Sequence, residues 1–116
     1  MSIIGDRLKW VIKQDDTEPA IRVQVKQKIN GSAVDLTGAT VTFHMMDAAG
    51  NLVIESAGTI ESPPTDGIVN YQWVTGNTAT AGKFDAEFFI EDLPSGGDLR
   101  VPNNDQIEII ITENLA

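Results

Sequence analysis

Two stretches of the chain alternate apolar and polar residues most regularly, and they follow each other closely in the sequence. Residues 66–74 (DGIVNYQWV) place Val69, Tyr71 and Trp73 on one side of an extended chain. Residues 81–91 (AGKFDAEFFIE) likewise gather apolar side chains on one side, namely Phe84, Ala86, Phe88 and Ile90. Successive side chains of a strand point to opposite faces, so each stretch predicts a strand with one buried face. Because aromatic side chains bury the most area per residue, we expect these two strands to form the centre of the core.

The same alternation predicts further strands along the rest of the chain. They cover residues 8–13, 21–26, 39–46, 52–54, 59–61 and 106–112. Turn residues separate them, and Asn30-Gly31 is the strongest tight-turn signal because both residue types tolerate positive φ. No stretch of about ten or more residues repeats its apolar residues with the period of a helix. Short strands at this spacing predict an all-β protein, an antiparallel β-sandwich of about seven to eight strands.

Length and charge narrow the class of protein. The chain has 116 residues and carries a net charge of −9, and this length suffices for one domain with its own core. We expect residues 8–113 to form that domain and residues 1–7 to form a flexible N-terminal arm. Strong negative charge repels phosphate groups, which argues against nucleic acid or a membrane surface as a partner. The sequence shows neither a membrane span nor a secretion signal, so we expect synthesis in the cytoplasm.

The sequence offers little catalytic or metal-binding chemistry. Its single histidine, His44, falls on the polar face of a predicted strand, and no Gly-x-Ser-x-Gly nucleophile motif is present. We interpret His44 as an exposed structural residue. Asp15, Asp16 and Glu18 cluster in a polar break, but they lack the glycine-spaced loop of calcium sites and are interpreted as turn acids. The absence of cysteine excludes thiolate ligands and a cysteine nucleophile. We therefore expect no enzyme, no cofactor and no metal site.

Several motifs resemble one family, and they occur in the order in which that family has them. Residues 12–19 (IKQDDTEP) and 34–46 (VDLTGATVTFHMM) are similar to the start of the immunoglobulin-like domain of tailed-phage structural proteins. The best-known member of this group is the N-terminal domain of BppU-type baseplate upper proteins. Residues 66–73, 81–89 and 101–103 continue the resemblance, which spans about residues 8–112 and implies an immunoglobulin-like β-sandwich. Within it, Asp35 and Thr37 are expected to bond to their own backbone and shape a turn.

The resemblance also implies a function. Such modules are non-enzymatic structural or adaptor proteins of the tailed-phage virion that dock other virion proteins in the baseplate, tail or neck. They often form rings around the tail axis, so a homo-oligomeric ring and localisation to the virion, after synthesis in the host cytoplasm, are expected. The family's domain is one end of a longer chain, whereas here it stands nearly alone, and the resemblance does not choose among the three locations.

The interface candidates are apolar residues that the alternation places on outward faces or in the N-terminal arm. They are Ile3, Ile4, Val11, Met46, Phe89 and Ile110. Phe89 and Ile110 belong to the two longest apolar strands and would form one patch if these strands are neighbours. An unpaired sheet edge offers a second docking route, by addition of a strand from the partner.

A carbohydrate-binding module for the host cell surface is the alternative function. Trp10, Tyr71 and Trp73 are the aromatic side chains that would stack on sugar rings. Tyr71 and Trp73 share the apolar face of their strand, however, so we favour a core position for both. A calcium-regulated adhesion module that uses the acids of residues 15–18 is a weaker third reading.

Overall fold

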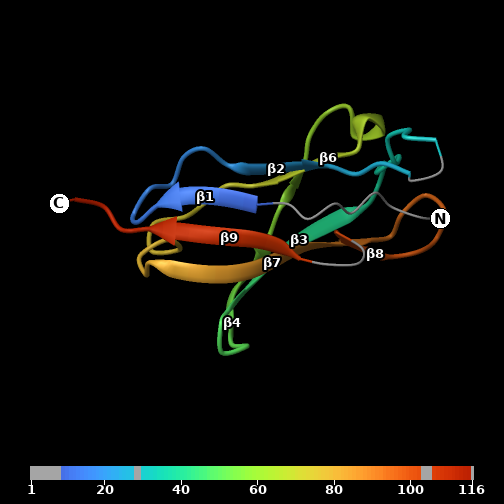
Figure 1. Cartoon of the computed structure of the whole chain (residues 1–116). Helices are drawn as coiled ribbons and strands as arrows, with labels where there is room; N and C mark the ends of the chain where they lie inside the picture. Colours follow the sequence, from blue (N-terminus) through green and yellow to red (C-terminus); the bar gives the residue numbers. More distant parts are fainter. Residues whose placement is uncertain (1–8, 28–29, 103–105, 116) are drawn as a thin grey trace.

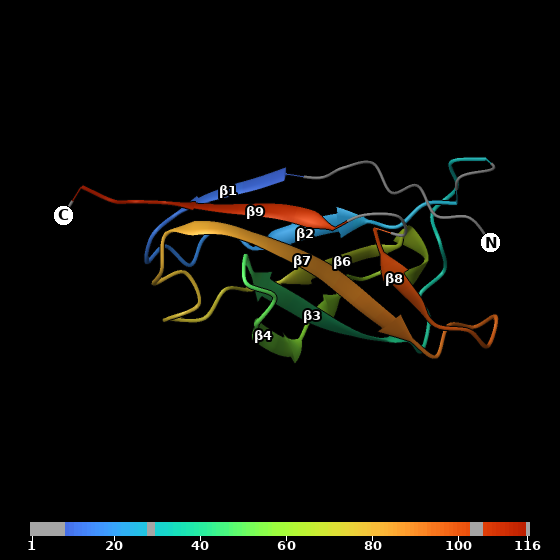
Figure 2. The same ribbon diagram turned by 60° about the horizontal axis from the view of Figure 1, so that its bottom comes forward.

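The described part of the computed structural model, residues 9–27, 30–102 and 106–115, forms two packed β-sheets. The larger sheet has the order β1 (Lys9–Lys13), β9 (Ile107–Thr112), β7 (Gly82–Glu91), β3 (Thr40–Asp47) and β4 (Leu52–Ala57), and β8 (Leu99–Val101) also pairs with β7. The smaller sheet has the order β2 (Ile21–Gln24), β6 (Ile68–Tyr71) and β5 (Thr59–Ile60). A single-turn 3-10 helix, η1 (Pro64–Asp66), precedes β6. In Figure 1, β2 and β6 lie above β9 and β7, and Figure 2 shows the larger sheet from β1 to β4.

The all-β sandwich predicted from the sequence is confirmed, with two differences in detail. The described residues contain nine strands instead of seven or eight, and β8 is the strand that the sequence analysis did not predict. Its three residues, which follow the turn at residues 94–97 and precede Pro102, are too few to show an alternation. The second difference is that β1 pairs with β9 in parallel, whereas the other named pairs are antiparallel. A period of two identifies a strand's faces but not its direction.

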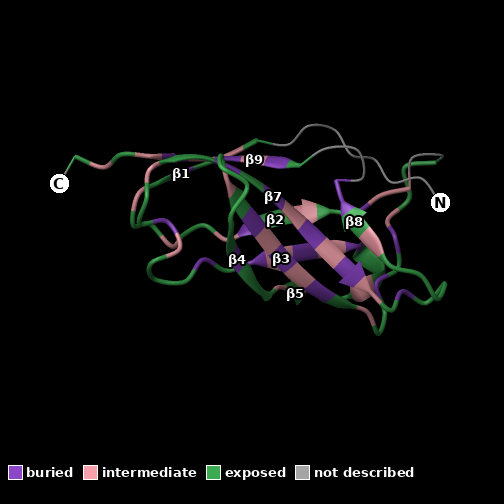
Figure 3. Cartoon of the chain, turned by 90° about the horizontal axis from the view of Figure 1, so that it is seen from below, coloured by how far each residue is buried: buried purple, intermediate pink, exposed green. Residues whose placement is uncertain are grey.

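The core lies between the two sheets and is centred on aromatic rings. Phe43 of β3 is fully buried, and its ring contacts those of Tyr71, Trp73 and Phe88 at centroid distances of 4.5, 5.7 and 5.1 Å. Tyr71 and Trp73 come from the β6 side and Phe88 from β7, so the prediction that these two segments form the centre of the core is confirmed. Figure 3 shows the cause: buried and partly exposed residues alternate along β3 and β7.

Two turns predicted from the sequence are also confirmed. The Asp35 side chain accepts hydrogen bonds from the backbone N–H and the hydroxyl of Thr37, at 3.0 and 2.6 Å. Gly31 has φ +71°, in the left-handed region that the Asn-Gly signal requires. These turns lead the chain from the smaller sheet into β3.

Candidate docking surface

The outer face of the larger sheet, which is the face turned away from β2, β5 and β6, carries four of the predicted interface residues. Val11, Met46, Phe89 and Ile110 each alternate with buried residues of their strand. Ile3 and Ile4 lie outside the described residues, as does the rest of the predicted arm. The four described candidates share one face, but they are distributed over three separate places on it.

Val11 and Ile110 occupy the first place, where β1 lies beside β9. They are directly paired in the parallel register, and Lys83 of β7 lies on the other side of Ile110. Val11 is 57% exposed, and Ile110 is partly buried. Lys9 and Lys13 share the face of Val11, since they are two positions away along the strand. The result is a small apolar spot bordered by lysines.

Phe89 occupies the second place, near the far end of β7. Its ring is covered by the guanidinium of Arg100, whose central carbon lies 4.1 Å from the ring centroid. The length of β7 separates Phe89 from Lys83, the residue opposite Ile110, by about 20 Å. The strands β7 and β9 are neighbours, as the sequence analysis supposed, but Phe89 and Ile110 do not form the single patch that it expected.

Met46 occupies the third place, on the hairpin formed by β3 and β4. Leu52 lies directly opposite Met46, and Val53 follows at a bulge in the pairing. These three residues are 44%, 49% and 46% exposed, and the hairpin projects from the body of the sandwich in Figure 1. Leu52 and Val53 were not among the predicted interface residues. The Ala49-Gly50-Asn51 turn reverses the chain, and it therefore places both residues beside Met46 on the neighbouring strand.

The hairpin turn is held by one carboxylate. The Asp47 Oδ1 accepts hydrogen bonds from the backbone N–H groups of Ala49 and Asn51, at 3.0 and 2.9 Å. The Asp47 N–H donates to the carbonyl oxygen of Asn51 at 2.9 Å. The backbone hydrogen bond from Asn51 is the main reason why the pKa of Asp47 is lowered. The ionised carboxylate therefore presents the apolar residues on a defined turn.

A shallow concavity of about 480 Å³ opens on the outer face between this hairpin and β7. Its lining residues are His44, Met46, Leu52, Glu55, Asp85, Ala86, Glu87 and Gln106. The apolar part of the lining comes mostly from the hairpin. The remainder is polar, and most of the charged groups in it are carboxylates.

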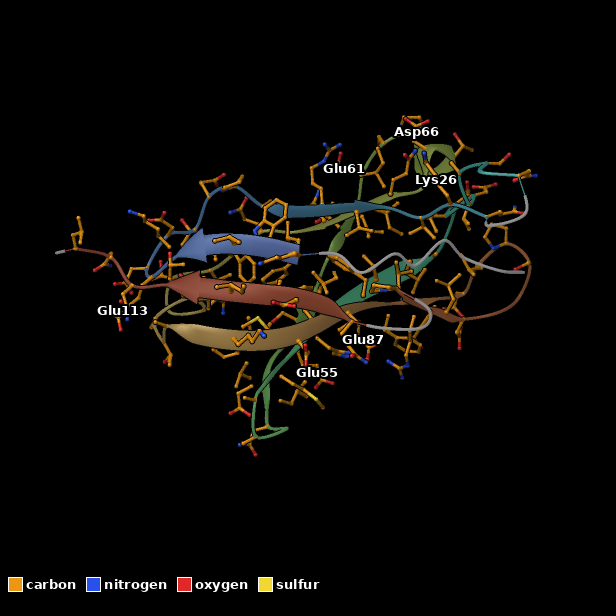
Figure 4. The ribbon with its side chains drawn as sticks, in the orientation of Figure 1. Lys26, Glu55, Glu61, Asp66, Glu87 and Glu113 are labelled. Atoms are coloured by element: carbon orange, nitrogen blue, oxygen red, sulfur yellow. The ribbon has the colours of Figure 1, made fainter. Side chains whose placement is uncertain are left out.

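The charge around the concavity is predominantly negative. The side chain of Glu55 is 63% exposed, and its Oε2 lies 3.4 Å from His44 Nε2. Glu87 lies 3.6 Å from the Nη1 of Arg100, and Asp85 is paired in register with Glu108 of β9. Figure 4 shows Glu55 and Glu87 on the opposite side of the molecule from Glu61 and Asp66. The surroundings of the concavity thus combine exposed apolar side chains with predominantly negative charge.

His44 is more enclosed than the sequence analysis expected. Its side chain is 18% exposed, and it lies between Glu55 and the ring of Phe89, whose centroid is 6.4 Å away. Among the described residues, no group of three or more His, Asp or Glu side chains is placed to hold a metal ion. The same residues contain no helix that is long and apolar enough to cross a bilayer.

The aromatic residues required by the carbohydrate-binding alternative lie in the interior. Tyr71 and Trp73 are 3% and 2% exposed, which confirms the predicted core position of both. Trp10 is partly buried and packs against the core. A sugar ring therefore has no access to the faces of Tyr71 and Trp73.

A search of curated proteins finds no match. A comparison with protein families matches residues 9–115 to the BppU N-terminal domain, a domain of phage baseplate proteins. This match covers both sheets and every strand described above. The chain therefore belongs to the BppU N-terminal domain family.

Proposed function

We propose that this chain is a non-enzymatic structural adaptor of a tailed-phage virion, and that it docks other virion proteins in the baseplate, tail or neck. The observation that carries this proposal is the family match over residues 9–115, because it includes the entire sandwich. The chain is present in the particle after synthesis in the host cytoplasm. Its mechanism is passive: a rigid core holds a docking face in a fixed geometry, and no chemical step is involved.

The outer face of the larger sheet is the proposed docking face. It carries Val11, Phe89 and Ile110, and the β3–β4 hairpin adds Met46. Ile3 and Ile4 of the N-terminal segment extend the contact to a neighbouring subunit, and identical copies form a ring. Interfaces between proteins that are already folded typically have an apolar core with a polar rim, and each of these apolar residues has polar neighbours on the same face. The net charge of −9 supports protein partners rather than nucleic acid or an anionic membrane.

Deletion of the gene from the encoding phage, with complementation by plasmid, tests this proposal. We expect the deletion to yield incomplete particles with no infectivity, and the wild-type chain to restore assembly. Complementation with Met46→Asp is expected to fail, because the charge disrupts the exposed hairpin contact while the fold is retained. Val74→Asp is the matched control, since Val74 is 59% exposed but lies on the loop after β6. Normal infectious particles from the deletion would overturn the proposal.

A further inference from the structure

The free edges of the two sheets differ in how well they are protected against strand addition. β1 carries exposed lysines at both ends, and β2 carries the exposed Arg22. β5 has two residues, and β8 has three and is followed by Pro102. Short length, basic side chains and proline are three of the devices that keep an edge from pairing with another chain, and β-bulges are a fourth.

β4 lacks the first three of these devices, and its bulge is confined to one end of the strand. It is the last strand of the larger sheet and has six residues, LVIESA, without lysine, arginine or proline. Every residue of β4 except Ile54 is exposed. The bulge between Met45 and Met46 affects the start of the strand, and residues 54–57 keep an unbroken register with β3. Among the described strands, β4 is therefore the edge best suited to accept a further strand.

Side chains next to this edge indicate which strand it accepts. Glu55 points to the outer face beside His44, and Leu52 points to the same face beside Met46. A strand added to β4 would place its own outward side chains about 5 Å from these two. A basic side chain opposite Glu55 would meet its carboxylate, and an apolar side chain opposite Leu52 would meet that residue.

We propose that β4 is the site where this chain binds its partner by strand addition, and that the partner is an extended segment of a different protein with alternating apolar and basic residues. This inference rests on the proposed docking function and specifies the partner's chemistry. The charge complementarity is local, because Glu55 is the carboxylate closest to the edge and its side chain is 63% exposed. The apolar residues of the added segment then cover the exposed surface of Leu52 and Val53.

A second copy of this chain fits the same edge poorly. An antiparallel pair of β4 strands with both outer faces on one side brings the two Glu55 side chains into neighbouring cross-strand positions, where like charges are destabilising. Each chain also carries a net charge of −9. The electrostatic argument therefore favours a basic segment from another protein.

Titration of the full chain with short labelled peptides, followed by amide NMR shifts and fluorescence anisotropy, tests this inference. The probe alternates valine with lysine, and the comparison peptides alternate valine with glutamate and glycine with lysine. We expect the valine–lysine peptide alone to bind and to shift the amides of residues 52–57. Glu55→Lys is expected to weaken binding by about tenfold or more. Asp66→Lys changes the net charge equally on the opposite side of the molecule (Figure 4) and is expected to leave binding unchanged.

Several results would overturn the inference. They are no binding of the valine–lysine peptide, shifts centred on other strands, equal binding of either comparison peptide, or equal weakening by the two lysine variants. If Glu55→Lys fails to fold, Glu55→Gln removes the charge with nearly the same shape and is expected to weaken binding in the same direction. Formation of a dimer through β4, detected by light scattering and amide shifts, would also overturn it.

The phage assay separates this inference from the proposed function. If deletion of the gene blocks assembly and a Glu55→Lys chain restores it fully, the β4 site is wrong and the structural role stands. If the deletion has no effect on assembly, the structural role itself fails.

Discussion

The rings of Phe43 and Tyr71 stack with their centroids 4.5 Å apart and their planes 9° from parallel, which joins β3 of the larger sheet to β6 of the smaller one. Phe43→Ala removes a fully buried ring and leaves a void between the sheets. We expect it to lower the free energy of unfolding by about 3–5 kcal/mol. Met46→Ala on the same strand, at an exposed position, is the control and is expected to cost about 0.5 kcal/mol or less. Equal losses in urea denaturation would contradict this account of the core.

Tyr71 is the single tyrosine of the chain, so its ionisation can be followed directly. Burial raises its pKa above the ordinary value, with a hydrogen bond to Ser56 acting in the opposite direction. The Tyr71 hydroxyl also donates to Asn77 Oδ1 at 2.7 Å. As the pH rises, the Tyr71 hydroxyl ionises in the unfolded chain before it ionises in the folded one. The contribution of this hydroxyl to stability is therefore complete below the unfolded pKa of about 10 and is lost as the pH rises through the folded pKa.

Absorbance at alkaline pH measures this shift. We expect the native protein to titrate at higher pH than the same chain in guanidinium chloride. In Tyr71→Phe, the decline of stability with rising pH is expected to be shallower. Coincident titration curves of the native and denatured chains would show that burial does not perturb this hydroxyl.

Gly67 provides a test of backbone packing beside η1. It has φ +69°, and a Cβ there would lie 2.7 Å from the Val25 carbonyl oxygen and 2.9 Å from that of Val34. Gly38, at φ +76°, has open space around the same position. Alanine at either site has a left-handed backbone conformation that costs about 1–2 kcal/mol, and only Gly67→Ala adds a clash with backbone atoms. We expect a clearly lower melting temperature for Gly67→Ala than for Gly38→Ala; equal values would contradict the close approach.

Glu61 makes the stability of the smaller sheet dependent on pH in the acidic range. Its carboxylate accepts two hydrogen bonds from Arg22, at 2.7 and 2.8 Å, and one from Asn70 at 2.8 Å. The hydrogen bonds from Arg22 are the largest cause of its lowered pKa, followed by that from Asn70. Since the folded pKa lies below the unfolded one, this stabilisation is present above the unfolded pKa of about 4.3 and is lost as the pH falls through the folded pKa.

The matching variant is Glu61→Gln. We expect its urea midpoint to be lower than that of the wild type at neutral pH, and to decline less between about pH 6 and pH 3. The effect is expected to be small beside that of Phe43→Ala, because the Arg22 side chain is 57% exposed. Parallel curves for the two proteins would exclude a contribution from this carboxylate.

Most of the fold could be predicted from the sequence, because alternation alone identifies which side chains are buried. The alternating apolar residues around Tyr71 and Phe88 are core residues, as predicted. Phe43, from the predicted strand at residues 39–46, packs with them. The Asp35–Thr37 turn was also predictable, since its hydrogen bonds are local in sequence.

The arrangement of the candidate site was not predictable in the same way. Alternation places Phe89 and Ile110 on outward faces, but only the register of β7 against β9 shows that they are far apart. The bulge in the β3–β4 hairpin breaks the alternation at Val53, and so conceals the apolar residues that meet Met46. Edge position and strand direction depend on contacts between residues that are distant in sequence, as the parallel pairing of Val11 with Ile110 shows.

The central claim, that this chain is a structural component of the virion, is tested most directly by peptide mass spectrometry on density-purified particles of the encoding phage. The copy number is measured against the major capsid protein. We expect the chain to be present at a fixed low multiple that corresponds to one ring or a few rings. Its absence from particles, with the protein left in the lysate, would contradict a permanent role in the virion.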